Sequence, residues 1–394
     1  MGFLEKSKVT LTILCEGDTV APASTVTGAL QVEVHHEVVF TALRIRLRGK
    51  EKFYVQRRDA QGHTYTEHRH FTHVEEVHTL LGAPVGSASS GSTQLAPGTY
   101  VYPFSVLVPS QAPPSFKRCR HEYGCTLAYK LKGLLDIPHG FDAEVEYDLT
   151  VTQAVPISQL QPARQNLKAL PLSEAHIAKC RCCGSCFCCV DEESFIRTEA
   201  AIAPEIVLLH SHVQLPAVTA VSSSFNNADG ADALVSAMPV SADATAALLR
   251  IRVTNFARDK ALSRCKVTMA QRHSFPRDDW CTYKDTFTFF KQEVVFPAGP
   301  LGTGQTATVE VLLRLDEAHA GLPSGERLLP CLAVKHFSIF TELQITFPEV
   351  AAEGTMWESN ALLLADEVDM TSQSLVIPHT YDQELRVAGE APLV

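Results

Sequence analysis

The chain has 394 residues and carries 44 acidic against 34 basic side chains, for a net charge of −10. This length has room for two domains with a core in each, and the acidic balance excludes a general nucleic-acid binder, which needs a dense basic face. No apolar run approaches the roughly 20 residues that span a bilayer, and the first residues lack the apolar stretch of a secretory signal. We therefore expect a cytoplasmic protein whose thiols are reduced.

The first half of the chain alternates apolar and polar residues with the period of two that is typical of β-strands. At 43–48, leucine and isoleucine alternate strictly with arginine, and Gly49 ends the strand. The prolines at 109–114 cannot take part in a regular ladder, so we expect a stiff extended link there. The strands predicted for this half are 9–15, 25–34, 43–48, 53–55, 64–80, 100–108, 123–136 and 143–155.

The second half returns to the strand pattern after a polar, proline-containing linker. Residues 218–244 are rich in small side chains and poorly patterned, which predicts an inserted loop. The apolar runs and strands predicted here are 202–215, 247–255, 264–272, 282–296, 306–315 and 333–347. The chain is thus predicted to be all-β, with two tandem antiparallel immunoglobulin-like β-sandwiches and almost no helix.

These patterns divide the chain into four parts. The last part is acidic and has no sustained period, so we expect it to be flexible. The parts are an N-terminal sandwich at 1–156, a linker with a cysteine-rich cluster at 157–193, a C-terminal sandwich at 194–350 and the tail at 351–394.

An ordered set of residues in the first half resembles the signature of the arrestin N-terminal domain. A glycine, a Pro-Phe strand, a proline, a Pro-Ser-Phe link and a tyrosine-containing strand that ends in an acid follow one another. The residues are Gly98, Pro103, Phe104, Pro109, Pro114, Ser115, Phe116, Tyr129 and Asp136. The opening segment also resembles the family at Pro22, Gly28, Leu47 and Gly49, but departs from it at Ala23 and Ser24, where Gly-Glu is usual. A strand ending in Asn255 and one ending in Gln271 look like the arrestin C-terminal domain.

The resemblance, which is nearest to the α-arrestins, implies a cytosolic scaffold or adaptor. Such a protein binds cytoplasmic regions of membrane proteins and couples them to endocytic or endosomal trafficking, using the sandwich faces and exposed strand edges. The signature residues would maintain the fold. An alternative is an arrestin-fold subunit of a retromer-like endosomal coat. The Pro-Pro-x-Tyr motif that many α-arrestins use to dock ubiquitin ligases is absent, because the pair Pro113-Pro114 is followed by Ser115 and Phe116.

Catalysis is not indicated by any motif. The sequence contains no Gly-x-Ser-x-Gly, no phosphate-binding glycine loop and no His-Glu-x-x-His. We therefore expect a binding protein rather than an enzyme and assign no catalytic residue.

A dense cysteine cluster between residues 180 and 189 leaves three interpretations open. Short Cys-x-x-Cys spacing allows a zinc site, exposed thiols beside basic and aromatic residues suit S-palmitoylation and contact with a membrane, and free thiols are the third reading. The zinc reading would make the chain a metal-binding or redox protein. The cysteines are Cys180, Cys182, Cys183, Cys186, Cys188 and Cys189.

Histidines also gather in one predicted strand. His68 and His70 would share one face of it, whereas the nearest acids, Glu67 and Glu75, fall at odd offsets and would point to the other face. We therefore predict a solvated β surface rather than a metal site here.

The expected tail contains a short trafficking pattern. Glu358 lies four residues before the pair Leu362 and Leu363, as in the acidic dileucine motifs that clathrin adaptors bind. Such short patterns also arise by chance, and the alternative is a segment that packs on the body of the protein.

Overall fold

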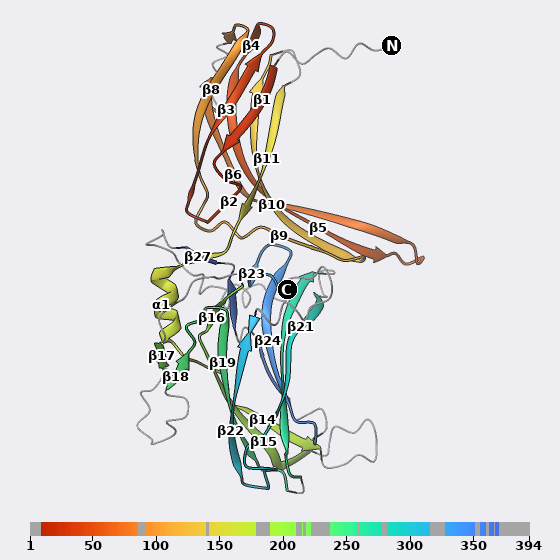
Figure 1. The fold of residues 1–394 in the computed structure, drawn as a ribbon. Coiled ribbons are helices and arrows are strands. Elements are labelled where there is room, and N and C mark those ends of the chain that lie inside the picture. Colours follow the sequence, from red (N-terminus) through yellow and green to blue (C-terminus); the bar gives the residue numbers. More distant parts are fainter. Residues whose placement is uncertain are drawn as a thin grey trace, which may run out of the picture. The chain divides into compact units, whose positions relative to one another are not determined.

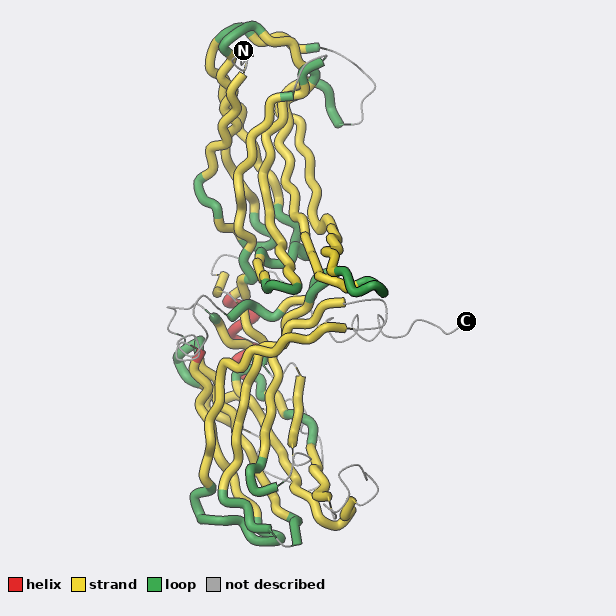
Figure 2. The backbone as a smooth tube through the Cα atoms, turned by 90° about the vertical axis from the view of Figure 1, so that its right-hand side faces the viewer, coloured by secondary structure: helices red, strands yellow, loops and turns green. Residues whose placement is uncertain are grey.

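The computed structural model describes residues 9–85, 92–138, 142–178, 190–209, 215, 218–221, 237–258, 260–276, 282–315, 328–350, 355–359, 362–365 and 367–369. The contacts divide the chain into a first unit, Met1–Gln153 with Val334–His336, and a second unit, Ala154–Ala333 with Phe337–Val394. Strands predominate in both, which confirms the all-β prediction, and one helix, α1 (Ile157–Gln165), is described in full (Figure 2). Among the described residues, no helix is both long and apolar enough to cross a bilayer.

The first unit is built from two main sheets (Figure 1). Its strands are β1 (Val9–Cys15), β2 (Thr19–Val20), β3 (Thr25–Val34), β4 (Val38–Phe40), β5 (Ala42–Arg58), β6 (Thr64–Gly82), β7 (Thr93–Leu95), β8 (Gly98–Leu107), β9 (Phe116–Cys119), β10 (Tyr123–Asp136) and β11 (Ala143–Val151). One sheet has the order β1-β3-β8, and the other has the order β2-β11-β10-β5-β6, with β9 beside β10 and a small β4-β7 pair outside both. The paired ends of β5, β6 and β10 extend away from the three-stranded sheet (Figure 1).

Alternation along the strands decides which face is buried. On β5, Leu43, Ile45 and Leu47 are all 0 % exposed, while the arginines between them lie on the opposite face. On β10, Tyr123, Cys125, Leu127, Tyr129 and Leu131 are buried together, as predicted from their period of two. The core of the first unit therefore lies where the sequence pattern places it.

The signature residues hold the link between β8 and β10. The hydroxyl of Tyr129 donates a 2.6 Å hydrogen bond to the carbonyl of Pro113. Ser115 makes two bonds to one residue, because its N–H donates to the Val151 carbonyl at 2.7 Å and its Oγ accepts from the Val151 N–H at 2.9 Å. Phe116 is buried beyond it at the start of β9. Hydrogen bonds to Tyr129 of β10 and to Val151 of β11 thus hold the predicted stiff link in place.

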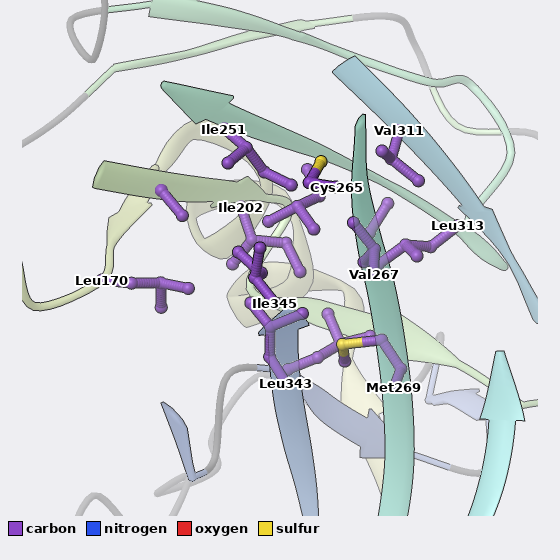
Figure 3. Close-up of a cluster of buried hydrophobic side chains, with 14 of the residues drawn as sticks. Leu170, Ile202, Ile251, Cys265, Val267, Met269, Val311, Leu313, Leu343 and Ile345 are labelled. Atoms are coloured by element: carbon purple, nitrogen blue, oxygen red, sulfur yellow. The ribbon is translucent and has the colours of Figure 1, made fainter. Parts of the chain in front are cut away.

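The second unit is a further pair of sheets. Its strands are β12 (Ala154–Pro156), β13 (Lys168–Ala169), β14 (Ser173–Ala178), β15 (Val190–Ala203), β16 (Ile206–Leu208), β17 (Val218–Val221), β18 (Ala237–Val240), β19 (Ala246–Asn255), β20 (Arg264–Pro276), β21 (Thr282–Val295), β22 (Thr306–Arg314), β23 (Leu332–Ala333), β24 (Ser338–Thr346), β25 (Thr355–Ser359), β26 (Leu363–Ala365) and β27 (Glu367–Asp369). One sheet has the order β13-β15-β19-β22 with β14 on β15, and the other has β21-β20-β24-β23 with β25 on β24. Ile251 and Val311 of the first sheet pack with Val267 and Leu343 of the second in one core (Figure 3).

Two buried amides stabilise the loops of this unit. Asn255, 0 % exposed at the end of β19, donates to the carbonyls of Lys260 and Leu301, both at 2.8 Å. Gln271 on β20 donates to the carbonyl of Leu329 at 2.7 Å. Each amide occupies a strand position that the sequence singled out, and each donates a hydrogen bond to loop backbone.

Three segments contain more regular structure than the sequence predicted. The expected linker at 157–193 is partly structured within the second unit, because Leu160 of α1 packs in a small core with β16 and β26 while β13 and β14 pair with β15. The expected loop at 218–244 contains the β17-β18 hairpin, whose Met238 is buried. The expected tail at 351–394 contains β25, β26 and β27, which pair with β24, β16 and β12. In each case a few apolar residues are enough to form regular structure, because a neighbouring strand is present for them to pack against or pair with.

Candidate binding surface

The outer face of the six-stranded sheet carries a row of cations along β5. Arg44, Arg46, Arg48, Lys50 and Lys52 alternate with the core positions of that strand and therefore share one face. Cross-strand register places Lys130 of β10 opposite Arg48 and Lys132 opposite Arg46. The face is thus basic over most of its length, in a chain whose net charge is −10.

Acidic partners neutralise one half of this row. Arg44 pairs with Asp136 and Arg46 with Glu75. On β10, Lys130 lies 2.6 Å from Glu146 and Lys132 pairs with Glu144. Such exposed pairs contribute little to stability, but they leave no free charge for a ligand.

The two lysines at the other end of this row lie beside further basic side chains on β6 and β9, and this group has no such acidic partners among the described residues. Within the described part of the chain, no ion pair is formed by Lys50, Lys52, His68, His70 or Lys117, which we name the basic patch. In the register, Lys52 faces His70 on β6 and Thr126 on β10, and Thr126 in turn faces Lys117 on β9. The five basic side chains therefore lie on one face of four adjacent strands, near the end of the sheet where β5 turns into β6.

The positive charges of the basic patch affect the pKa of a neighbouring histidine. Desolvation, followed by the positive charges of Lys50, Lys52 and His68, lowers the pKa of His70. Tyr54 of β5 is opposite His68 in the register. The two rings are tilted relative to each other, with their centroids 6.2 Å apart. An anion bound here would relieve the repulsion, so the surface is suited to carboxylates or phosphates.

The core face of the same strand end carries a buried carboxylate. Glu51 is 0 % exposed and accepts hydrogen bonds from Nε2 of His73 at 2.7 Å and from the N–H of His336, a residue of the same unit, at 2.8 Å. The Sγ of Cys125 also donates to it at 3.7 Å. Burial would raise the pKa of Glu51, but the bonds from His73 and His336 outweigh it and the pKa is lowered.

The histidines of β6 separate into two roles. His68 and His70 are exposed on one face, as strand alternation predicts. His73 lies where the register with β5 shifts, and it turns instead toward Glu51. The sequence alone did not point to this bond, because nothing local marks the bulge.

The dileucine pattern lies in the interior of the second unit. Leu362 is 0 % exposed in the main core, and Leu363 is partly buried in β26 beside β16. Glu358 belongs to β25, opposite Leu343 of β24. The prediction of an adaptor-binding dileucine is therefore corrected in favour of its alternative, a segment packed on the body, since clathrin adaptors need both leucines exposed.

The cysteine cluster lies outside the described residues. This applies to Cys180, Cys182, Cys183, Cys186, Cys188 and Cys189. The zinc and lipidation predictions for these residues stay predictions.

The basic patch was missed at the sequence level. Its signal was present in part, because Lys50 and Lys52 continue the alternation of the arginines at 44–48. The decisive feature is that the positions facing Lys50 and Lys52 on β6 and β10 carry no acid, and only the register between strands shows this.

The chain has two β-rich units, and the first of them bears the basic patch. Residues 16–158 match the family model "Arrestin (or S-antigen), N-terminal domain", which supports assigning the first unit to the arrestin family. That family consists of non-enzymatic scaffold proteins that bind cytoplasmic regions of membrane receptors. A search of curated protein sequences gave no match to this chain.

Proposed function

We propose that the protein is a cytoplasmic adaptor of the α-arrestin type that binds acidic cytoplasmic segments of membrane proteins and couples them to endocytic or endosomal trafficking. The observation that carries the proposal is the basic patch, because five basic side chains that form no ion pair within the described residues share one sheet face of a chain with a net charge of −10. The mechanism is reversible binding, in which carboxylates or phosphates of the partner supply the missing counter-charges.

The basic patch favours regulated cargo binding over the coat-subunit alternative. A constitutive complex needs a large apolar interface, whereas an exposed charged surface gives fast, salt-sensitive association. An endosomal coat subunit would instead co-purify with a stoichiometric partner.

Charge reversal tests the proposal directly. We would measure the binding of purified full-length chain to an array of synthetic cytoplasmic segments, each in acidic, phosphorylated and scrambled neutral forms. The double variant Lys50→Glu with Lys52→Glu should weaken binding of the acidic and phosphorylated forms by about tenfold or more. The matched control is Lys284→Glu with Lys291→Glu, which makes the same change in net charge at two exposed positions of β21. Equal loss in both variants would reject the basic patch as the binding surface.

The cysteine cluster carries a second, separate proposal about attachment. S-palmitoylation at Cys180, Cys182, Cys183, Cys186, Cys188 or Cys189 would hold the adaptor at the plasma membrane or at endosomes, and a bound zinc ion would instead fold this segment. Intact mass before and after hydroxylamine, with metal content measured on the same sample, separates the two. Loss of mass in acyl-chain steps supports the anchor, and one zinc per chain without acyl loss supports the metal site.

A further inference from the structure

A three-residue segment from the second half of the sequence belongs to the first unit. Val334–His336, which we call the strap, lies between β23 and β24, yet its contacts group it with Met1–Gln153. Its backbone is held by one carboxylate, because the N–H groups of Lys335 and His336 donate to the two oxygens of Glu51 at 3.2 and 2.8 Å. Both backbone bonds of the strap therefore depend on a single side chain.

Two imidazoles meet the same carboxylate. Nε2 of His73 lies 2.7 Å from one oxygen of Glu51, and Nδ1 of His336 lies 3.1 Å from the other. Both histidine side chains are 13 % exposed and the carboxylate is 0 % exposed. Within the described residues, no lysine or arginine forms an ion pair with Glu51. A buried carboxylate is costly unless a positive charge accompanies it, so the counter-charge here must come from a protonated imidazole.

The other ionisable groups around Glu51 come from three elements. On β10, the Sγ of Cys125 donates to Glu51 at 3.7 Å, and burial followed by the charge of Glu51 raises the pKa of this thiol, so it adds no second negative charge. On β9, Arg118 is opposite Cys125 in the register. The ammonium group of Lys335 in the strap lies 5.9 Å from the centroid of the Phe71 ring. The two imidazoles are therefore the charged partners that Glu51 has among these groups.

We infer that Val334–His336 is a proton-controlled strap, which is held against β5 when His73 or His336 is protonated beside Glu51 and is loosened when both imidazoles are neutral. A neutral imidazole keeps its hydrogen bond to the carboxylate but supplies no charge, whereas a protonated one supplies both. Histidine is the side chain that changes charge between pH 5 and 8. A fall in pH within this range therefore tightens the strap, until the carboxylate itself is protonated at lower pH. The inference does not depend on the proposed function.

The strap packs behind the basic patch. Lys50 and Lys52 flank Glu51 in β5 and alternate onto the opposite face. The ring of His336 stacks on Phe53, the next residue on the core face of β5, with 6.0 Å between the ring centroids. Loosening the strap removes this stack and both backbone bonds from one side of a strand whose other side carries the basic patch. A change in pH is thus transmitted to the surface that we propose as the binding site.

Amide hydrogen exchange of the full-length chain, measured by NMR at pH 6 and pH 8, tests the inference. EDTA is present throughout, so that no metal ion takes the place of the proton. The protection factors of the Lys335 and His336 amides, corrected for the intrinsic effect of pH on exchange, should be at least about fivefold higher at pH 6. The reference is the amide of Gln56, which donates to the backbone carbonyl of Glu122 at 2.7 Å. Its protection should change by less than about twofold.

Variants identify the groups that bind the proton. The double variant His73→Gln with His336→Gln keeps an N–H donor at each position but cannot be protonated, so the pH difference at the strap should fall below about twofold. The matched control His78→Gln, on β6 outside this cluster, should keep the full difference. Equal protection of the strap at both pH values in the wild type, or an equal change at Gln56, overturns the inference without any variant. Persistence of the difference in the double variant overturns it as well, and neither result bears on the proposed function, because no partner is present.

Discussion

Gly49 of β5 and Tyr129 of β10 face each other in the register, and a Cβ at position 49 would lie 2.4 Å from Cε1 of the Tyr129 ring. The ring is 0 % exposed and its hydroxyl is bonded to Pro113. The glycine that ends the predicted strand 43–48 is thus needed for space beneath a signature tyrosine. The close contact between position 49 and the Tyr129 ring accounts for both of these signature residues.

Replacing Gly49 by alanine should destabilise the first unit by about 1–3 kcal/mol, because the Tyr129 ring must move within a packed core. Urea denaturation followed by tyrosine fluorescence would measure the change. Gly17→Ala is the control, since a Cβ at position 17 has no heavy atom within 4 Å. Equal stability of the two variants would contradict this account of the tyrosine packing.

The variant Ser115→Ala should lose about 1–2 kcal/mol of stability, because it removes the acceptor for the N–H of Val151, a residue that is 1 % exposed. Hydrogen exchange at the amide of Val151 should become faster as a direct local readout. Ser110→Ala serves as the comparison, since the Ser110 hydroxyl bonds only an exposed side chain among the described residues. Unchanged exchange at Val151 would exclude the proposed role of Ser115.

The lowered pKa of Glu51 predicts a dependence of stability on pH. The contribution of a carboxyl with a depressed pKa in the folded state is complete above its unfolded pKa of about 4.3 and is lost as the pH falls through the folded pKa. We expect Glu51→Gln to be less stable than the wild type by about 1–3 kcal/mol at pH 7. The difference should shrink as the pH falls below about 4.

Chemical denaturation at several pH values between 3 and 7 would check this dependence. Glu144→Gln is a suitable control, because Glu144 pairs with Lys132 at the exposed surface. A constant difference between wild type and Glu51→Gln across this range would show that the carboxyl charge is not responsible.

Binding of an acidic peptide should raise the pKa of His70. In the free protein, desolvation and the charges of Lys50, Lys52 and His68 lower it, and an anion would stabilise the protonated imidazole. Titration of the histidine ring protons by NMR, with and without peptide, measures this shift. His78, outside the basic patch, is the internal reference, and equal shifts at both residues would indicate a general effect of the peptide instead.

Truncation of Leu362 should act on stability rather than on adaptor binding. The side chain is 0 % exposed in the main core of the second unit, so Leu362→Ala is expected to cost about 2–5 kcal/mol. Leu172→Ala, at a leucine that is 55 % exposed, should stay within about 0.5 kcal/mol of the wild type. If Leu362→Ala left the midpoint of denaturation unchanged, the burial of this segment would be in doubt.

The sequence could predict most of the longer strands of the first unit because strand alternation is a local property, although β5 continues through Gly49, where the strand was expected to end. Leu43, Ile45 and Leu47 point to the core for the same reason that the arginines between them do not, and only neighbours two residues away are needed to see it. The same reasoning was less successful for the tail, because β26 is only three residues long and acquires its place from pairing with β16.

The composition, the alternation along β5 and β10 and the ordered signature by themselves determined the β class, the buried faces and the resemblance to arrestins. Tertiary structure alone decided that His73 meets Glu51 and that Leu362 is buried. It also decided that, among the described residues, Lys132 forms an ion pair with Glu144 whereas Lys52 forms none. These facts depend on cross-strand register and on a bulge, which bring together residues distant in sequence, and no local pattern records such pairings.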